Sequence, residues 1–321
     1  MKLDKKQLKK IKGDASFRVF FRKKAKKKNS IIVYAERDKE KNLLIYDSIN
    51  KLLIKNNIRA PKLYSENYKN NYIEIEDFGK NTLNKILTKE NKDKIQLFKK
   101  TILLLKKIQK INKNKTKNFK NNFYKIPTYS NEILFNETKM FCDWYVPKLK
   151  SKKKSILFNK QFKIKIKHLL SKLKLKNNIF VHRDFHVSNL MYYKKNIAVI
   201  DSQDALIGNK AYDLASLIDD VRFKTTKDFK DSIYKYYVSL NKNNINQTLF
   251  KNDFETLSIL RNLKIIGIFS RLAIRDKKKK YLKLIPNAWK LIELRMNNNS
   301  LFKDLKLFLD VNFPKKIRIK K

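Results

Sequence analysis

The sequence predicts an α+β protein with a small β-rich N-terminal part and a larger, mostly helical C-terminal part. Strand-like alternation is concentrated before residue 80, and helical periodicity dominates after it. The chain has 321 residues, of which 42% are hydrophobic, enough for two domains or one large two-part unit. Only 4 Gly and 5 Pro are present, which excludes collagen-like and Pro/Gly-rich disordered chains.

The N-terminal elements follow from local patterns. Residues 17–22 alternate partially, residues 31–34 form a β-rich run, and the KKKNS segment between them predicts a hairpin turn. Apolar residues at helical spacing over 43–53 predict a helix. The run YIEIEDF at 72–78 alternates again and predicts a strand. Together these elements make a small α+β unit of about 75–80 residues.

Helical spacing dominates the rest of the chain. We expect helices within 92–111, 131–150 and 159–174, and again after residue 213. The polar segment 113–127 predicts a loop. Two short β-rich runs, 178–182 and 196–201, interrupt the helical part.

Charge and cysteine content limit the possible classes. Lys and Arg number 78 against 29 Asp and Glu, a net charge of +49. Such a charge is typical of proteins that bind nucleic acid or anionic membranes, but lysine is spread along the chain, which favours a compositional bias. We expect only non-specific attraction of polyanions.

The single cysteine, Cys142, excludes a disulfide framework. No membrane-spanning run or secretory signal is seen, which predicts a cytoplasmic protein with no membrane partner. The sequence does not predict an oligomeric state.

The segment 178–220 carries the candidate chemistry. If residues 190–200 form a hairpin, Asn189 and Asp201 lie close together at its open end, with Asp184 on the adjoining loop. A carboxylate and an amide oxygen suit Mg²⁺, which takes oxygen ligands and few protein groups. Asp184 would then face an attacking hydroxyl. These parts are typical of phosphoryl transfer.

The pattern H-x-D-x-H-x-x-N, followed by a hydrophobic strand and an aspartate, resembles the signature of the aminoglycoside phosphotransferase and choline kinase superfamily. The segments GDASFRVFFR, EDFG, DSQDALIGNKAYDLASLIDD and IIGIFSRLAIRDKKKKYLKLIPNAW look like its anomeric N-acetylmuramate/N-acetylglucosamine kinase branch, over nearly the whole chain. The resemblance implies a bilobal protein-kinase-like fold, with a nucleotide-covering lobe over 1–79 and a helical lobe over 80–321. It also implies ATP, Mg²⁺ and a small amino-sugar substrate phosphorylated in cell-wall recycling.

The resemblance assigns roles residue by residue. Asp184 matches the catalytic base, and Asn189 and Asp201 match the metal ligands. His182, His186 and Asp213 match residues that support the catalytic loop. The nucleotide-binding positions are Gly13, Asp14, Ala15, Ser16, Phe17 and Arg18 in the phosphate-covering turn, and Glu76 in the hinge.

The sequence departs from the family pattern in three places. The N-terminal loop has one glycine, the DFG-like position reads Asp-Ser-Gln, and the strand 31–34 has no phosphate-pairing lysine. Candidates to replace that lysine are Arg18, Arg22, Arg37 and Lys39.

Three further residues each have two interpretations. Asp204 contacts substrate or caps a turn, Trp144 stacks on a sugar or belongs to the core, and Arg271 pairs with a substrate carboxylate or is a surface charge. A zinc site at His182 and His186 is disfavoured, because no glutamate motif or cysteine partner accompanies them. The alternative functions are an aminoglycoside- or choline-type alcohol kinase, and a basic nucleic-acid-binding protein on a degenerate kinase fold.

Overall fold

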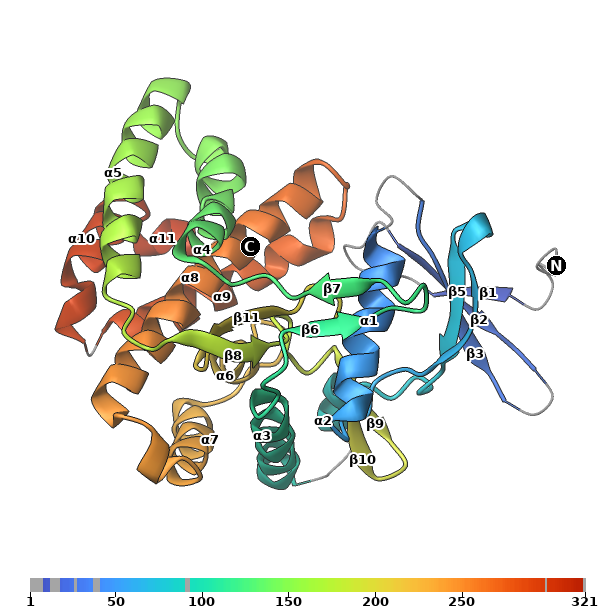
Figure 1. Cartoon of the computed structure of the whole chain (residues 1–321). Helices are drawn as coiled ribbons and strands as arrows, with labels where there is room; N and C mark the ends of the chain where they lie inside the picture. Colours follow the sequence, from blue (N-terminus) through green and yellow to red (C-terminus); the bar gives the residue numbers. More distant parts are fainter. Residues whose placement is uncertain are drawn as a thin grey trace. The chain divides into compact units, whose positions relative to one another are not determined.

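A computed structural model describes residues 8–11, 18–25, 28–36, 41–89, 93–297 and 299–319. The chain forms two compact units, Met1–Pro127 with Ile179–Ile207 (unit 1) and Thr128–Asn178 with Gly208–Lys321 (unit 2). Figure 1 shows a β-sheet near the N-terminus and a mostly helical remainder, so the predicted α+β class is confirmed. The predicted lobe boundary at residue 79 lies inside unit 1 and stays a prediction.

Unit 1 contains a five-stranded antiparallel sheet. Its strands, in spatial order, are β1 (Leu8–Ile11), β2 (Val19–Lys23), β3 (Ser30–Tyr34), β5 (Tyr72–Glu76) and β4 (Leu63–Asn67). The predicted β2–β3 hairpin is confirmed. The strands β1 and β4 were not predicted, because edge strands with polar sequences such as LKKI and LYSEN lack a continuous apolar face.

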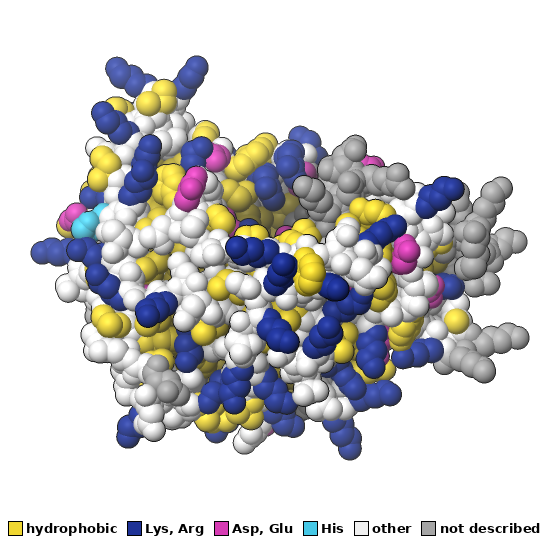
Figure 2. All heavy atoms as spheres, in the orientation of Figure 1, with side chains coloured by type: hydrophobic (Ala, Val, Ile, Leu, Met, Phe, Trp, Pro, Cys, Tyr) yellow, Lys and Arg dark blue, Asp and Glu magenta, His cyan; other side chains and the backbone are white. Residues whose placement is uncertain are grey.

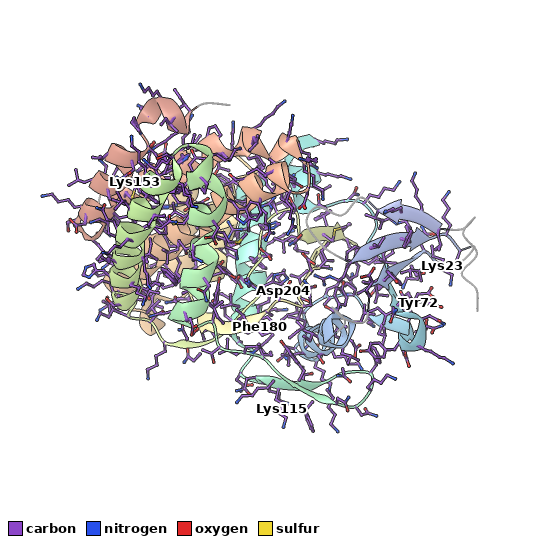
Figure 3. The ribbon with its side chains drawn as sticks, turned by 90° about the horizontal axis from the view of Figure 1, so that it is seen from above. Lys23, Tyr72, Lys115, Lys153, Phe180 and Asp204 are labelled. Carbon is purple, nitrogen blue, oxygen red and sulfur yellow. The ribbon has the colours of Figure 1, made fainter. Side chains whose placement is uncertain are left out.

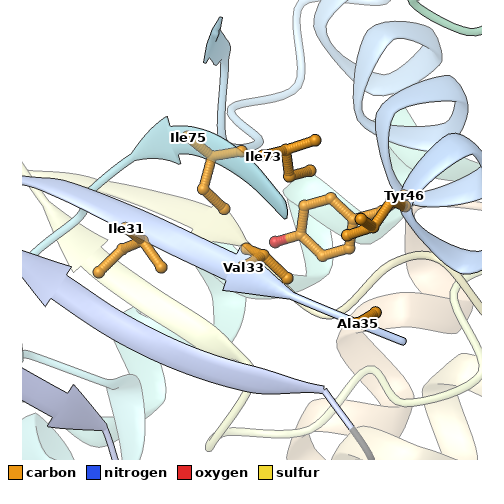
Figure 4. Packing of buried hydrophobic residues seen from close by; sticks show 7 residues of the cluster. Ile31, Val33, Ala35, Tyr46, Ile73 and Ile75 are labelled. Carbon is orange, nitrogen blue, oxygen red and sulfur yellow. The ribbon is translucent and has the colours of Figure 1, made fainter. Parts of the chain in front are cut away.

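One helix covers this sheet. The helix α1 (Lys41–Lys55) directs Leu43 and Tyr46 against Ile31, Val33 and Ile73 of the central strands (Figure 4). These side chains are almost fully buried. The spacing of the apolar residues in α1 therefore reflects one core-facing stripe, as the sequence predicts.

Unit 1 continues with α2 (Leu83–Lys89), α3 (Lys94–Gln109) and a short hairpin of β6 (Lys115–Lys117) and β7 (Phe123–Lys125). The Asp93 side chain caps α3 by accepting a hydrogen bond from the backbone N of Gln96. The hairpin corrects the prediction of a loop over 113–127. Strands of three residues are too short to show an alternating pattern, and tertiary contacts such as the bond from Thr116 Oγ1 to the Ser48 carbonyl hold them.

Two further strand pairs carry the segment of interest. β8 (Asn177–Val181) pairs with β11 (Leu206–Asn209), and β9 (Leu190–Tyr193) pairs with β10 (Asn196–Val199). The β9–β10 turn holds Lys194 and Lys195 at positive φ, the type I′ geometry that Asn-Gly normally supplies. The two predicted β-rich runs are confirmed.

Unit 2 is helical. Its helices are α4 (Asn131–Thr138), α5 (Lys152–Ser171), α6 (Tyr212–Ile218), α7 (Lys227–Ser239), α8 (Gln247–Ile274), α9 (Ile285–Met296), α10 (Lys303–Asn312) and α11 (Lys315–Arg318). A π-helical turn, Phe141–Tyr145, follows α4. The buried helix α8 packs against this turn so closely that a Cβ on Gly267 would lie 2.3 Å from the Met140 carbonyl carbon. Glycine is therefore required at this crossing.

A buried ionic group lies in unit 2. Asp219 receives two hydrogen bonds from Arg295 and one from Ser258, and Lys230 lies 3.4 Å away. Burial raises the pKa of Asp219, but the two cations outweigh burial and lower it to about 2. Within the described residues, no helix has the length and hydropathy needed to cross a membrane.

Candidate active site

The β9–β10 hairpin builds the candidate site within unit 1. The backbone N of Ile200 donates to the carbonyl of Asn189 at 3.0 Å, which closes the open end of the hairpin beyond the Leu190–Val199 pair. Asn189 and Asp201 therefore flank the same end, as the sequence predicts. The loop after β8 brings Asp184 to this end of the hairpin.

The backbone oxygen of Asp184 organises residues 184–189, the predicted catalytic loop. It accepts hydrogen bonds from the backbone N of His186 at 3.0 Å and from Asn189 Nδ2 at 3.2 Å. The backbone N of Asn189 in turn donates to the His186 carbonyl at 2.9 Å. Because the Asn189 amide nitrogen is engaged in this way, its Oδ1 is the atom suited to a cation.

Two non-glycine residues of the site have left-handed backbone conformations. Arg183, next to Asp184, has φ of 74°, and Asp201 has φ of 63°. Such conformations cost about 1–3 kcal/mol each and persist only where surrounding contacts enforce them. A strained backbone therefore orients the side chains of Asp184 and Asp201.

Arg18 faces two acidic side chains of residues 201–204, the predicted metal-binding segment, called the metal loop below. Its Nη2 lies 3.7 Å from Asp201 Oδ1 and 3.8 Å from Asp204 Oδ2. Asp204 lies in the segment between β10 and β11. Figure 3 labels its side chain. Gln203 Nε2 bridges the same two carboxylates, at 3.2 Å and 2.7 Å. The two aspartates thus form an acidic pair shared by one cation and one amide.

The electrostatic environment of Asp201 is acidic. Desolvation raises the pKa of its carboxyl, Arg18 opposes this effect, and the charges of Asp184 and Asp204 raise it further. Three carboxylates therefore lie close enough to repel one another, and a bound cation would relieve that repulsion. Oxygen donors from an aspartate and an asparagine fit Mg²⁺.

The metal loop is tied to α1. Ser202 Oγ donates to Asn50 Oδ1 at 2.8 Å, and both side chains are buried. Tyr46, one turn earlier on α1, has its pKa raised by burial and by the charge of Asp201. The apolar pattern over 43–53 includes Tyr46 but gives Asn50 no role, because a bond between residues 152 positions apart leaves no local pattern.

The hinge segment is held by a different arginine. Arg22 donates from Nε and Nη2 to the two carboxylate oxygens of Asp77, and Nη2 also donates to the Gly79 carbonyl at 2.7 Å. The predicted nucleotide residue Glu76 ends β5 and lies 3.6 Å from Lys28 Nζ. Of the candidates for the missing lysine, Arg22 thus binds at the hinge, whereas Arg18 faces Asp201 and Asp204.

A small buried apolar cluster adjoins the hinge. Phe78 packs with Met191 and Ala198, which come from β9 and β10, and its ring lies 5.1 Å from that of Tyr193. The hinge and the metal-loop hairpin therefore share one small core in unit 1.

The two loop histidines are buried. Burial lowers the pKa of His182 to about 4, so its imidazole is neutral at pH 7. His186 Nε2 lies 3.5 Å from the Asn189 amide. Across the part of the chain that the structure describes, no group of three or more His, Cys, Asp or Glu side chains is arranged to hold a metal.

The remaining predicted residues fall elsewhere. Asp213 is buried in the first turn of α6, Trp144 is half-buried in the π-helical turn, and Arg271 is half-buried on α8, all in unit 2. Their roles stay predictions. The predicted nucleotide residues 13–17, Gly13, Asp14, Ala15, Ser16 and Phe17, lie outside the described residues, as do Arg37 and Lys39. A cavity of about 560 Å³ between α7, α8 and α9 contains none of the predicted residues.

The basic residues form no single patch on the face in view. Figure 2 shows Lys and Arg side chains scattered over it, with few acidic ones between them. Dedicated nucleic-acid binders concentrate positive charge on one face, and no such concentration is visible on the face in view.

A β-sheet covered by one helix is followed by a loop and a hairpin that bring together an aspartate, an asparagine and a second aspartate. This arrangement defines the class of phosphotransferases with a kinase-like fold. The chain belongs to the phosphotransferase enzyme family, which it matches over residues 7–241. The predicted superfamily is therefore confirmed, and use of ATP follows from the kinase family.

Two curated relatives are similar over most of their length. The N-acetylmuramate/N-acetylglucosamine kinase of Neisseria meningitidis is 27% identical over 284 residues, covering 85% of this chain and 81% of the relative. The Pseudomonas aeruginosa protein of the same name is 26% identical over 287 residues, covering 88% and 81%. An ethanolamine kinase structure from Plasmodium vivax shares the fold, with a TM-score of 0.58, 15% identity and coverage of 90% and 82%.

Proposed function

We propose that the protein is an ATP-dependent kinase that transfers the γ-phosphoryl group to the anomeric hydroxyl of N-acetylmuramate or N-acetylglucosamine. The observation that carries this proposal is the hairpin closure between Ile200 and Asn189, which aligns Asn189 and Asp201 beside the loop of Asp184. The acceptor is inferred from the names of the two relatives.

In this proposal Asn189 Oδ1 and the Asp201 carboxylate hold Mg²⁺. The bond from Asn189 Nδ2 to the Asp184 carbonyl supports this assignment, because it fixes which amide atom faces a cation. The bound metal would neutralise the developing charge on the phosphates. The carboxylates of Asp184 and Asp204 add to the negative field that favours a divalent ion.

Asp184 accepts or orients the proton of the acceptor hydroxyl. The buried His182 and His186 support the loop rather than react, which agrees with the lowered pKa and neutral ring of His182. Asp213 remains the proposed brace of the catalytic loop.

The nucleotide base would contact the hinge near Glu76, which the buried apolar cluster of Phe78 and Met191 supports. Residues 13–17 would cover the phosphates. The cytoplasm supplies ATP, and we therefore propose a cytoplasmic location together with this function.

Arg271 is the proposed contact for an acidic acceptor. Its Nε is buried without a hydrogen-bond partner among the described residues, and burial lowers its pKa. An arginine fork fits a carboxylate such as the lactyl group that distinguishes N-acetylmuramate from N-acetylglucosamine. Trp144 and Asp204 are the other proposed acceptor residues.

The test is an ADP-release assay with N-acetylmuramate, N-acetylglucosamine, glucose, kanamycin and choline as acceptors, followed by phosphorus NMR of the product. We expect turnover with the two amino sugars and phosphate at the anomeric oxygen. Asp201→Ala should abolish turnover while thermal denaturation shows a folded protein. Preference for choline or kanamycin, or retained activity in Asp201→Ala, would overturn the assignment.

A further inference from the structure

The strand that normally supplies a phosphate-pairing lysine has none here. Strand β3 reads Ser-Ile-Ile-Val-Tyr. Arg18, which directly precedes β2, is only 6% exposed and directs its guanidinium at Asp201 and Asp204 instead. A buried cation therefore already occupies the acidic pair at which the proposed metal site lies.

The ion pair between Arg18 and the two aspartates is a long one. Both N···O distances, 3.7 Å and 3.8 Å, exceed hydrogen-bond length. The direct hydrogen bonds to the two carboxylates come from Gln203 instead. Arg18 thus supplies charge to the acidic pair without being locked to it.

We propose that Arg18 is an internal counter-ion that balances Asp201 and Asp204 in the metal-free protein and transfers its guanidinium to the nucleotide phosphates when the metal–nucleotide complex binds. This inference rests on the proposed function. Arginine keeps its charge at all working pH values, and its planar fork matches phosphate oxygens. The same side chain thus replaces the missing lysine and prevents an uncompensated acidic pair when no metal is bound.

The proposal predicts effects of opposite sign on two ligands. Without nucleotide, Arg18 competes with a divalent ion, so its removal should tighten metal binding. With nucleotide, Arg18 contacts phosphate, so its removal should weaken nucleotide binding. An arginine that only stabilises the fold would weaken both.

The experiment measures Mn²⁺ binding by electron paramagnetic resonance in the absence of nucleotide, and binding of a non-hydrolysable ATP analogue with Mg²⁺ by calorimetry. In Arg18→Met we expect Mn²⁺ affinity to rise about fivefold, as for loss of a partly screened charge. The affinity for the nucleotide analogue should fall about 10–100-fold, the effect of one charge-assisted contact.

Arg22→Met is the matched control. It removes the same charge from the neighbouring part of the same hairpin, but its guanidinium binds Asp77 rather than the acidic pair. We expect its Mn²⁺ affinity without nucleotide to equal that of the wild type. An equal rise in both variants would mean a general charge effect and would overturn the proposal.

A second variant covers the case in which Arg18→Met does not fold. Arg18→Lys keeps the charge but loses the fork, so Mn²⁺ affinity should stay within about twofold while nucleotide affinity falls several-fold. Unchanged nucleotide affinity in Arg18→Lys, or weakened Mn²⁺ binding in a folded Arg18→Met, would overturn the inference. A wild-type protein that binds no metal–nucleotide complex would instead overturn the proposed function itself.

Discussion

Replacing Ser202 by alanine tests whether α1 positions the metal loop. Ser202 stands where kinases of this fold have the phenylalanine of the DFG segment, and its hydroxyl binds Asn50 across a buried contact of 2.8 Å. Without that bond, Asn50 Oδ1 loses a buried donor, which costs about 1–3 kcal/mol. The neighbouring Asp201, at φ of 63°, loses part of what enforces its strained backbone.

If loss of the bond weakens Mg²⁺ binding by about 1.4 kcal/mol, the Mg²⁺ concentration for half-maximal activity rises about tenfold. The assay follows ADP release against Mg²⁺ at saturating acceptor, together with urea unfolding. We expect Ser202→Ala to lower the free energy of unfolding by about 1–3 kcal/mol and to shift the Mg²⁺ dependence.

Ser258→Ala provides the matched control. Ser258 is equally buried and donates to Asp219 at 2.6 Å, within the ionic group of unit 2. Its replacement should lower stability without changing the Mg²⁺ dependence. If Ser202→Ala leaves that dependence unchanged, or Ser258→Ala shifts it equally, the bond to α1 does not position Asp201.

Because burial lowers the pKa of His182 to about 4 from an unfolded value of about 6.5, its neutral ring contributes stability above pH 6.5 that is lost as pH falls towards 4, about 3 kcal/mol in total. Urea unfolding between pH 7 and 4 should show a fall that His182→Phe reduces, and an identical slope in both proteins would contradict this. Gly267→Ala should cost about 1–3 kcal/mol, measured by thermal denaturation, because its Cβ would meet the Met140 backbone; an unchanged melting temperature would refute the close approach. Arg271→Ala should raise the KM for N-acetylmuramate about tenfold or more and leave that for N-acetylglucosamine unchanged; equal effects on both sugars would argue against a carboxylate contact.

The central part of the site was predictable because it depends on residues that lie close together in the sequence. Twelve positions separate Asn189 from Asp201, and the intervening hydrophobic runs with a two-lysine turn predict a hairpin that brings them together. The class of fold was predictable for the same reason. Apolar residues recur every two residues in strands and every three to four in helices, so the two kinds of element can be distinguished in the sequence.

The rest depends on contacts between distant segments. Arg18 and Arg22 are equivalent in the sequence, yet one faces the acidic pair and the other binds Asp77 at the hinge. Asn50 reads as an ordinary helix residue, although it anchors the metal loop. Only the paired register of the sheet and the packing of α1 decide these partners, and neither leaves a local pattern.

The strands β6 and β7 were missed for a different reason. Each has three residues, and only one side chain of each is even partly buried, so no alternation can be read. Yet the hairpin places Tyr124 near the acidic pair, where burial first and the charge of Asp204 second raise the pKa of the Tyr124 hydroxyl. A polar segment can thus approach a site with no sequence signal.

The most direct test of the account compares Asp184→Asn with the wild type in two quantities measured side by side, the Kd for a metal–nucleotide complex and kcat for N-acetylmuramate. We expect a Kd within about twofold of the wild type and a kcat lowered about 10²–10⁴-fold, because in the proposed mechanism Asp184 accepts or orients the acceptor proton and does not hold the metal. Wild-type turnover in Asp184→Asn, or loss of nucleotide binding in a folded protein, would contradict it.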